Sequence, residues 1–175
     1  MRVIIIGCGN IGLKRIDAIS KIHSIEIVCL IETNPNQKAY FIKNSNSNIV
    51  DSQINGKEIG YNNILDISEG LDCLKEFSEP TCVIIKHNNP CAVASAKNIE
   101  SAYIKALSSD PKSAFGGVVL FNRKINANLA LKIIDKFYEV LVAPKFEKNS
   151  LNILISKKKM IIVESANLKI ENTSL

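Results

Sequence analysis

The sequence predicts an α/β protein with a mostly parallel sheet covered by helices. Short β-branched runs alternate along most of the chain with longer segments whose apolar residues recur at helical spacing. The strand-like runs at 2–6 and 81–85 are continuously apolar, which is typical of strands buried on both faces. Hydrophobic residues make up 46% of the 175 residues, so the chain can bury a sizeable core.

Residues 1–33 are predicted to form a strand, a helix and a second strand. The run at 2–6 ends at a glycine, isoleucines recur at helical spacing through 10–22, and an apolar run fills 25–32. The following stretch, 33–63, is rich in asparagine and contains only short apolar islands. We expect irregular chain there with at most a short hairpin.

The alternation of helices and strands resumes after this stretch. We expect helices at 64–77, 90–109, 126–138 and 147–156, and strands at 81–86, 116–122, 139–144 and 159–164. The helical spacing predicts inward-facing residues in the first three helices, namely Leu65, Leu71, Leu74 and Phe77, then Ala96, Ile99, Tyr103 and Leu107, then Leu129, Ile133, Ile134 and Phe137. The polar tail at 166–175 is predicted to fray.

The bulk composition argues against several classes of partner. The net charge of +5 is mild and scattered, and the run Lys157–Lys159 is predicted to be a solvated turn, so no nucleic-acid partner is expected. The five cysteines include no CxxC pair and suggest reduced thiols in the cytoplasm. The apolar start is too short for a signal peptide or a spanning segment, so we expect no membrane association.

The first motif is a glycine turn at the start of the chain. Gly7, Gly9 and Gly12 lie where the first strand should meet the helix, and Glu32 closes the second strand about 20 residues later. This pattern is that of a dinucleotide site, and it resembles the opening of a glucose–fructose oxidoreductase-type dehydrogenase that binds NAD(P). A glycine turn that only packs helix against strand is the alternative. No third strand is predicted after Glu32.

The second motif pairs Lys86 with His87 at the carboxyl end of the strand 81–86. Asn89 is a good helix N-cap and Pro90 a good first helical residue, so we expect the pair at the positive end of a helix. Backbone amides and Lys86 would favour an anion there, and His87 could carry a proton. The alternative is a surface lysine beside a histidine bonded to a carbonyl group. The glycines 116 and 117 begin the next strand, where the backbone must approach something closely.

Several segments together resemble the bifunctional purine-biosynthesis enzyme that joins 5-aminoimidazole-4-carboxamide ribotide (AICAR) transformylase to IMP cyclohydrolase. The resemblance runs in order from about residue 34 to about residue 164, through "NPNQKAYF", "INGKEIGYNNILD", "KEFSEPTCVIIKHNNPCAVA", "SSDPKSAFGGVVLFNRKINANLALKII" and "YEVLVAPKFEKNSLNILISKKK". It implies that His87 moves a proton during formyl transfer from 10-formyltetrahydrofolate to AICAR, assisted by Lys86. It further implies that Gly116, Glu139 and Asn88 contact the substrate.

The resemblance implies a fold related to the cytidine deaminases but without zinc. The sequence agrees with this, because "HNN" is not the HxE motif and Cys91 has no second cysteine three residues later. We therefore expect no metal. Cys91 would lie at a helix start, where its pKa could be lowered, or it is simply a small packing residue.

The chain departs from the family pattern in ways that limit the expected activity. Leu30, Ile31 and Glu32 stand where the family has an Arg-Tyr-Gly that grips the substrate phosphate. We expect a partial Rossmann-like start at 1–33, the N-terminal portion of the transformylase domain at 34–165 and a polar tail at 166–175. The cyclohydrolase half and the rest of the transformylase are expected to be missing, so transfer would require a homodimer or a complementary chain. An NAD(P)-binding oxidoreductase fragment and a non-catalytic fusion remnant are the alternatives.

Overall fold

The computed structural model describes residues 2–6, 26–31, 48–50, 52–57 and 59–165. The chain divides into two compact units, residues 1–52 and residues 53–175. In the first unit only the backbone of the strands is described.

The first unit contains a three-stranded sheet in the order β1-β2-β3, formed by β1 (Arg2–Ile6), β2 (Glu26–Ile31) and β3 (Asn48–Val50). Both neighbouring pairs are parallel. The structure therefore contains the two predicted parallel strands, while the predicted helix at 10–22 lies outside the described residues. The sequence did not predict β3, because a strand of three residues is too short to show a period.

The second unit contains a six-stranded sheet in the order β4-β9-β8-β7-β5-β6. Its strands are β4 (Ser52–Asn55), β5 (Thr81–Lys86), β6 (Asn89–Ser95), β7 (Val118–Phe121), β8 (Val140–Ala143) and β9 (Ile161–Glu164). The strands β7, β8 and β9 are parallel to one another, whereas β5 runs antiparallel to both β6 and β7. The predicted α/β class is confirmed.

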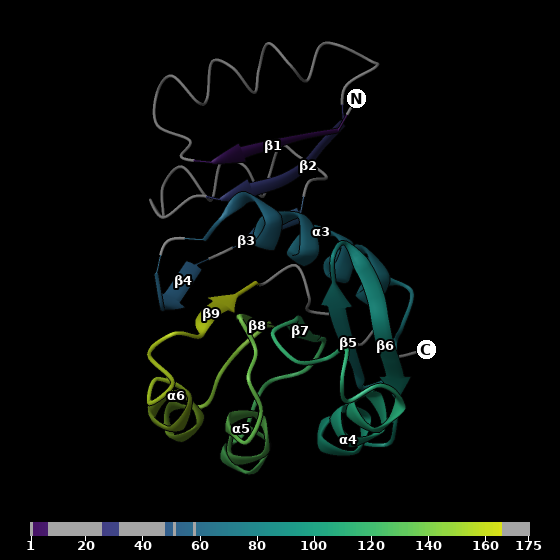
Figure 1. The fold of residues 1–175 in the computed structure, drawn as a ribbon, viewed down its shortest axis with the longest axis vertical. Coiled ribbons are helices and arrows are strands. Elements are labelled where there is room, and N and C mark those ends of the chain that lie inside the picture. Colours follow the sequence, from purple (N-terminus) through teal and green to yellow (C-terminus); the bar gives the residue numbers. More distant parts are fainter. Residues whose placement is uncertain (1, 7–25, 32–47, 51, 58, 166–175) are drawn as a thin grey trace, which may run out of the picture. The chain divides into compact units, whose positions relative to one another are not determined.

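Helices cover both faces of this sheet (Figure 1). One face carries α3 (Tyr61–Lys75), and the other carries α4 (Ile99–Ser109), α5 (Ala127–Ile134) and α6 (Lys148–Leu154). Successive side chains of a strand point to opposite faces of the sheet. The buried strands therefore pack apolar side chains against the helices on both faces. This is why β5, β7 and β8 read as unbroken apolar runs in the sequence.

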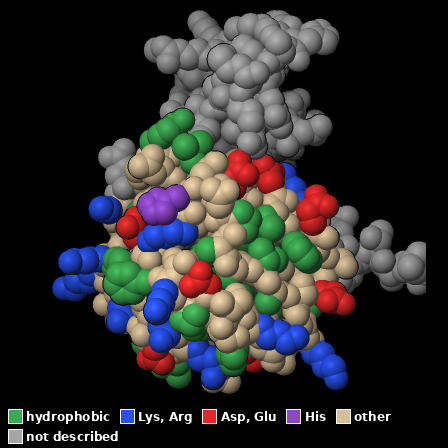
Figure 2. Space-filling view, turned by 45° about the vertical axis from the view of Figure 1, so that its right-hand side comes forward, with side chains coloured by type: hydrophobic (Ala, Val, Ile, Leu, Met, Phe, Trp, Pro, Cys, Tyr) green, Lys and Arg blue, Asp and Glu red, His purple; other side chains and the backbone are tan. Residues whose placement is uncertain are grey.

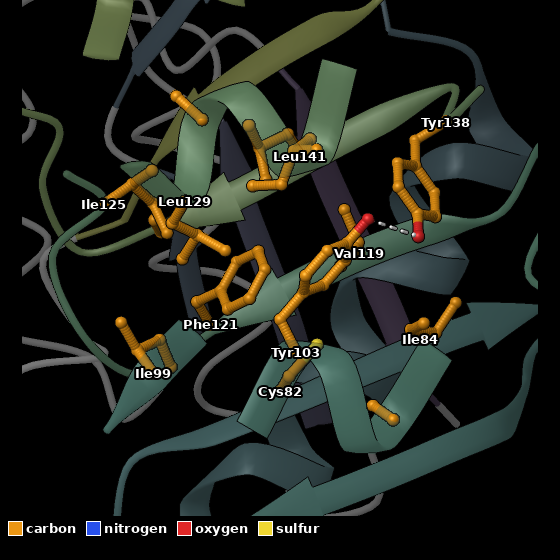
Figure 3. Close-up of a cluster of buried hydrophobic side chains, with 14 of the residues drawn as sticks. Cys82, Ile84, Ile99, Tyr103, Val119, Phe121, Ile125, Leu129, Tyr138 and Leu141 are labelled. Atoms are coloured by element: carbon orange, nitrogen blue, oxygen red, sulfur yellow. Dashed lines mark hydrogen bonds between the residues drawn. The ribbon is translucent and has the colours of Figure 1, made fainter. Parts of the chain in front are cut away.

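The larger core lies between the sheet and the helices α4 to α6 (Figure 3). Tyr103 from α4 and Tyr138 from the loop before β8 meet edge to face, with ring centroids 6.4 Å apart. Their hydroxyl groups are 3.2 Å apart, and Tyr103 also donates to the carbonyl oxygen of Lys132. The two phenols therefore satisfy one another inside an apolar layer.

Half of the twelve predicted inward-facing residues are buried. The core contains two of them from each helix, namely Leu71 and Leu74 of α3, Ile99 and Tyr103 of α4, and Leu129 and Ile133 of α5. The prediction was wrong for Phe137, whose side chain is 41% exposed, because α5 already ends at Ile134 with Asp135 as its C-cap. In α3 the core is made by Ile64 and Ile67 rather than by Leu65.

The predicted helix start at Asn89 and Pro90 is also wrong. These two residues begin β6, which pairs antiparallel with β5, and α4 begins ten residues later at Ile99. β6 lies at the edge of the sheet, where a proline is tolerated because one side of the strand needs no hydrogen-bond donor. The actual N-cap of α4 is Asn98, whose side chain accepts a hydrogen bond from the backbone N–H of Ser101.

Gly70 lets α3 lie directly against the sheet. A Cβ atom at this position would overlap the side chain of Leu120 on β7, with its Cδ2 atom only 2.7 Å away. The close approach fixes the distance of α3 from the strands β5 and β7.

Candidate functional site

The candidate site lies at one end of the six-stranded sheet, which we call the open end. It is formed by the carboxyl end of β5 and the amino ends of β7, β8 and β9, because Ile85 pairs with Val118, Val118 with Val140 and Val140 with Ile161. For β7 to β9 this is the amino edge, not the carboxyl edge at which open α/β sheets usually bind ligands. The antiparallel direction of β5 brings Lys86 to this edge.

Lys86 and Gly116 lie in direct proximity at the open end. The Nζ atom of Lys86 donates a hydrogen bond of 2.6 Å to the carbonyl oxygen of Phe115. Gly116 has a φ of 68°, and a Cβ atom there would lie 3.2 Å from that same Nζ atom. The backbone N–H of Gly116 donates to the carbonyl oxygen of Phe137, which ties this loop to the segment before β8. Glycine is therefore needed at 116 both for its backbone conformation and for the space that Lys86 occupies.

His87 and Asn88 form the two-residue turn between β5 and β6. Both have left-handed backbone conformations, with φ values of 52° and 62°, as hairpins of this length prefer. The turn replaces the predicted helix N-terminus, because residues 89–95 form β6 and α4 begins only at Ile99.

Two side chains hold this turn. The backbone N–H of Asn88 donates to the Oδ1 atom of Asp66 on α3 at 2.6 Å, and the amide group of Asn89 donates to the carbonyl oxygen of His87 at 3.0 Å. His87 itself is exposed. Figure 2 shows the histidine side chain at the surface, with Lys or Arg side chains beside it. Asp66 was not predicted, because a carboxylate inside a helix carries no local signal for a distant turn.

Glu139 lies at the same edge, directly before β8. Its backbone N–H donates to the carbonyl oxygen of Gly117, and its own carbonyl oxygen accepts from the N–H of Ile161. The exposed side chain borders a cavity of about 390 Å³. The other residues that line this cavity are Lys57, Asn63, Phe137, Lys158, Lys159 and Ile161. The structure thus brings Lys86, Gly116 and Glu139 to one edge of the sheet.

A second cavity of about 560 Å³ shares Phe137, Lys158 and Lys159 with the first. Phe115 and Phe137 stand at its wall as a tilted aromatic pair with centroids 5.2 Å apart, and both rings are largely exposed. Lys158 and Lys159 form the exposed turn before β9 that the sequence predicts, and they also line both cavities. The excess of lysines favours anionic ligands in this region.

The described thiols are structural. The Sγ atom of Cys91 donates to the carbonyl oxygen of Ile84 at 3.4 Å, and burial raises the pKa of the Cys91 thiol. Of the two alternatives for Cys91, the lowered pKa is wrong, because Cys91 lies in a strand and not at a helix start, whereas its packing against the core agrees with the other. Burial likewise raises the pKa of Cys82 on the neighbouring strand.

The predicted dinucleotide residues Gly7, Gly9, Gly12 and Glu32 lie outside the described residues. Within the ranges that the structure describes, no group of three or more His, Cys, Asp or Glu side chains could hold a metal ion. None of the helices described combines the length and apolar character needed to cross a bilayer.

Comparison with known proteins extends over most of the chain. A family model of the AICARFT/IMPCHase bienzyme matches residues 32–175. The bifunctional purine biosynthesis protein PurH of Caldicellulosiruptor bescii is 52% identical over 146 residues, which cover 80% of this chain and 28% of that protein. The PurH protein of Acetivibrio thermocellus is 45% identical over 135 residues, or 75% of this chain and 26% of the relative.

The chain spans about a quarter of the length of these curated relatives. The matched residues agree with the range over which the sequence resembles the bifunctional purine-biosynthesis enzyme, so this resemblance is confirmed. The chain belongs to the AICARFT/IMPCHase bienzyme family.

Proposed function

We propose that the open end binds AICAR and forms part of a formyltransferase site that uses 10-formyltetrahydrofolate. The observation that carries this proposal is the convergence of Lys86, Gly116 and Glu139 at one sheet edge, next to the turn that presents His87. Glu139 borders the cavity of about 390 Å³, and Lys86 and Gly116 lie at the same sheet edge. A lysine, a glycine backbone and a carboxylate can together hold a polar ribotide.

His87 is the proton carrier in this proposal. Formyl transfer breaks the bond between the formyl carbon and the folate nitrogen and forms a bond to the amino group of AICAR. The amine loses one proton and the folate nitrogen gains one, so an imidazole within reach of both can move it. Lys86, Asn88, Gly116 and Glu139 would position the ribotide.

The described residues supply one wall of such a site. Phe115 is 65% exposed and Phe137 is 41% exposed, so the open end is not covered within the described part of the chain. Since relatives are about four times as long as the matched region, we propose that a second wall comes from a homodimer partner or a complementary chain. Positioning of two substrates requires both walls.

The experiment is a titration of the chain with AICAR, followed by formyl-transfer assays of the chain alone and mixed with the remaining portion of a PurH relative. His87→Asn keeps a residue that tolerates the left-handed turn but removes the titratable ring. We expect the rate of transfer to fall by about 10²-fold or more with this variant. Lys105→Met, an exposed change on α4, is the control. An unaltered chain without AICAR binding or transfer in either assay contradicts the proposal.

The parallel order β1-β2-β3 favours a second candidate, a dinucleotide site built on Gly7, Gly9, Gly12 and Glu32. Under this reading residues 1–33 are a Rossmann-like start joined to the transformylase portion at 34–165, with 166–175 as a tail. The family match beginning at residue 32 supports that junction. A titration of NADH fluorescence tests it, and an unchanged signal at millimolar protein contradicts it.

The setting we propose is the cytoplasm. The described cysteines, Cys73, Cys82 and Cys91, are all free, which suits a reducing compartment.

A further inference from the structure

We propose that Asp66 is a positioning residue, which holds the turn of His87 and Asn88 in the conformation that presents the imidazole to the substrate. This inference rests on the proposed function of the open end. It concerns a residue of α3, which is remote in sequence from the turn it contacts.

The turn needs external support because of its backbone conformation. Two consecutive residues other than glycine have positive φ values, 52° at His87 and 62° at Asn88. Asparagine tolerates this region, whereas histidine reaches it at a cost in free energy. A turn that only had to reverse the chain would be more stable with glycine at one of these positions.

The carboxylate of Asp66 supplies that support. Its Oδ1 atom accepts the backbone N–H of Asn88 at 2.6 Å, which is a short, charge-assisted hydrogen bond. The other side-chain hydrogen bond to the turn within the described residues, from the amide of Asn89 to the carbonyl oxygen of His87, comes from a residue adjacent to the turn. Asp66 therefore links the turn to a separate element of the fold.

The helix that carries Asp66 is itself firmly placed. Its neighbours Ile64 and Ile67 are fully buried, and α3 packs on β5, the strand that leads into the turn. The turn is thus held from two directions, by its own strands and by α3. Without Asp66 only the hairpin would define where the imidazole lies, and misplacement by about 1 Å is enough to slow a reaction strongly.

The test compares Asp66→Ala with Asp66→Asn in the full chain, mixed with the remaining portion of a PurH relative for the activity assays. The asparagine side chain keeps an oxygen acceptor at the same place and should preserve the turn. Asp72→Ala is the matched control, because it removes another carboxylate of α3, one that pairs with Lys75.

Two measurements decide the outcome. In Asp66→Ala we expect amide hydrogen exchange at Asn88 to accelerate about tenfold and kcat of formyl transfer to fall about tenfold, with KM for AICAR within about threefold, since one charged hydrogen bond is lost. Asp66→Asn and Asp72→Ala should stay within about threefold of the unaltered chain in both measurements. A role limited to stability would not separate kcat from KM and would not be rescued by asparagine.

The results distinguish the two proposals. Unchanged exchange at Asn88, or accelerated exchange with unchanged kcat, in Asp66→Ala overturns the role of Asp66 and leaves the proposed function intact. Absence of transfer by the unaltered chain and its mixture overturns the proposed function instead.

Discussion

The two ends of the strand pair β5 and β7 are built in opposite ways. At the end where β5 begins, which we call the closed end, Asn122 accepts the backbone N–H of Thr81 at 2.8 Å and donates to the carbonyl oxygens of Phe77 and Glu79. The hydroxyl groups of Thr81 and Ser95 are 2.7 Å apart. Asn122 and Thr81 are buried, and their side-chain polar groups all have partners.

The open end has few contacts and is exposed. There Lys86 makes one hydrogen bond to a backbone carbonyl group, and His87 stands on a left-handed turn at the surface. Loss of a buried hydrogen bond costs more stability than loss of an exposed one, because a buried group left without its partner cannot bond to water instead. The comparison indicates that the sheet is held together at the closed end, which leaves the open end available for binding.

The largest expected effect is at the closed end. Asn122→Ala leaves the Thr81 amide and two carbonyl groups without their partner in a buried place. We expect the free energy of unfolding to fall by about 3 kcal/mol, measured by urea denaturation. Asn128→Ala, an exposed change on α5, should change it by less than about 0.5 kcal/mol. A loss at Asn122 as small as that of the control would contradict the comparison.

The next effect concerns the phenol pair beneath the open end and depends on pH. Burial raises the pKa of Tyr103 to about 12 and raises that of Tyr138 further. Both phenols ionise near pH 10 in the unfolded chain, so above pH 10 the unfolded state binds fewer protons and stability falls. Each phenol contributes a loss of about 1.4 kcal/mol per pH unit until its folded pKa is reached.

Tyr138→Phe should therefore make this fall shallower by about 1.4 kcal/mol per pH unit. Denaturation curves between pH 9 and pH 11.5 give the slopes directly. Tyr61→Phe is the control, since its ring is 65% exposed. Equal slopes for the unaltered chain and Tyr138→Phe would show that the pair titrates as exposed phenols do.

A smaller effect on stability is expected at Gly116. Alanine there must adopt a φ of 68° and crowd the Lys86 ammonium group, which should cost about 1 to 2 kcal/mol in the free energy of unfolding. The free energy of AICAR binding should weaken by more than the free energy of unfolding. Titration calorimetry measures the binding free energy. Gly60→Ser, placed where an added Cβ meets no atom within 4 Å, is the control. Full AICAR affinity in Gly116→Ala would remove this glycine from the site.

The smallest change in stability is expected for Lys86→Met. Its hydrogen bond is exposed, so the free energy of unfolding should change by less than about 0.5 kcal/mol. Under the proposed function, AICAR affinity should nevertheless weaken about tenfold, because a positive charge at the proposed site is lost. A lower free energy of unfolding with unchanged AICAR affinity would contradict this prediction. Lys86 would then stabilise the fold, as the residues of the closed end do.

The strands were predictable because burial on both faces leaves a direct trace in the sequence. Each of β5, β7, β8 and β9 is a continuous apolar run, and each was predicted within about two residues. The helix α5 was predicted too long, because the apolar period continues through Phe137 while the backbone turns at Asp135. Periodicity reports which residues are apolar and not where the helix ends.

The segment 89–95 was misinterpreted for a physical reason. Asn89 and Pro90 satisfy the local rules for a helix start, and the small residues that follow fit a helix or a strand equally well. These residues form a strand because they pair with β5, and this pairing is seen only in the folded structure. The asparagine N-cap at Asn98 was a signal in the sequence that the prediction overlooked.

The candidate site was predictable only in part. Lys86, Gly116 and Glu139 adjoin strand ends, so a sheet brings them together once the strand order is known. Four further residues lie at the open end but come from α3 and from the turn before β9, namely Asp66, Asn63, Lys158 and Lys159. Their placement depends on how these elements pack on the sheet. Nothing in their local sequence indicates that contact.

The packing of Gly70 in the core affects the position of the α3 residues that lie at the candidate site. Since α3 rests on Leu120 without an intervening side chain, a Cβ atom at position 70 would force either the Leu120 side chain or the helix to shift. A shift of the helix would also move Asp66 and Asn63, which lie on α3. Substitutions at positions 70 and 120 should therefore compensate for one another, and a change in the core would alter the geometry of the proposed site.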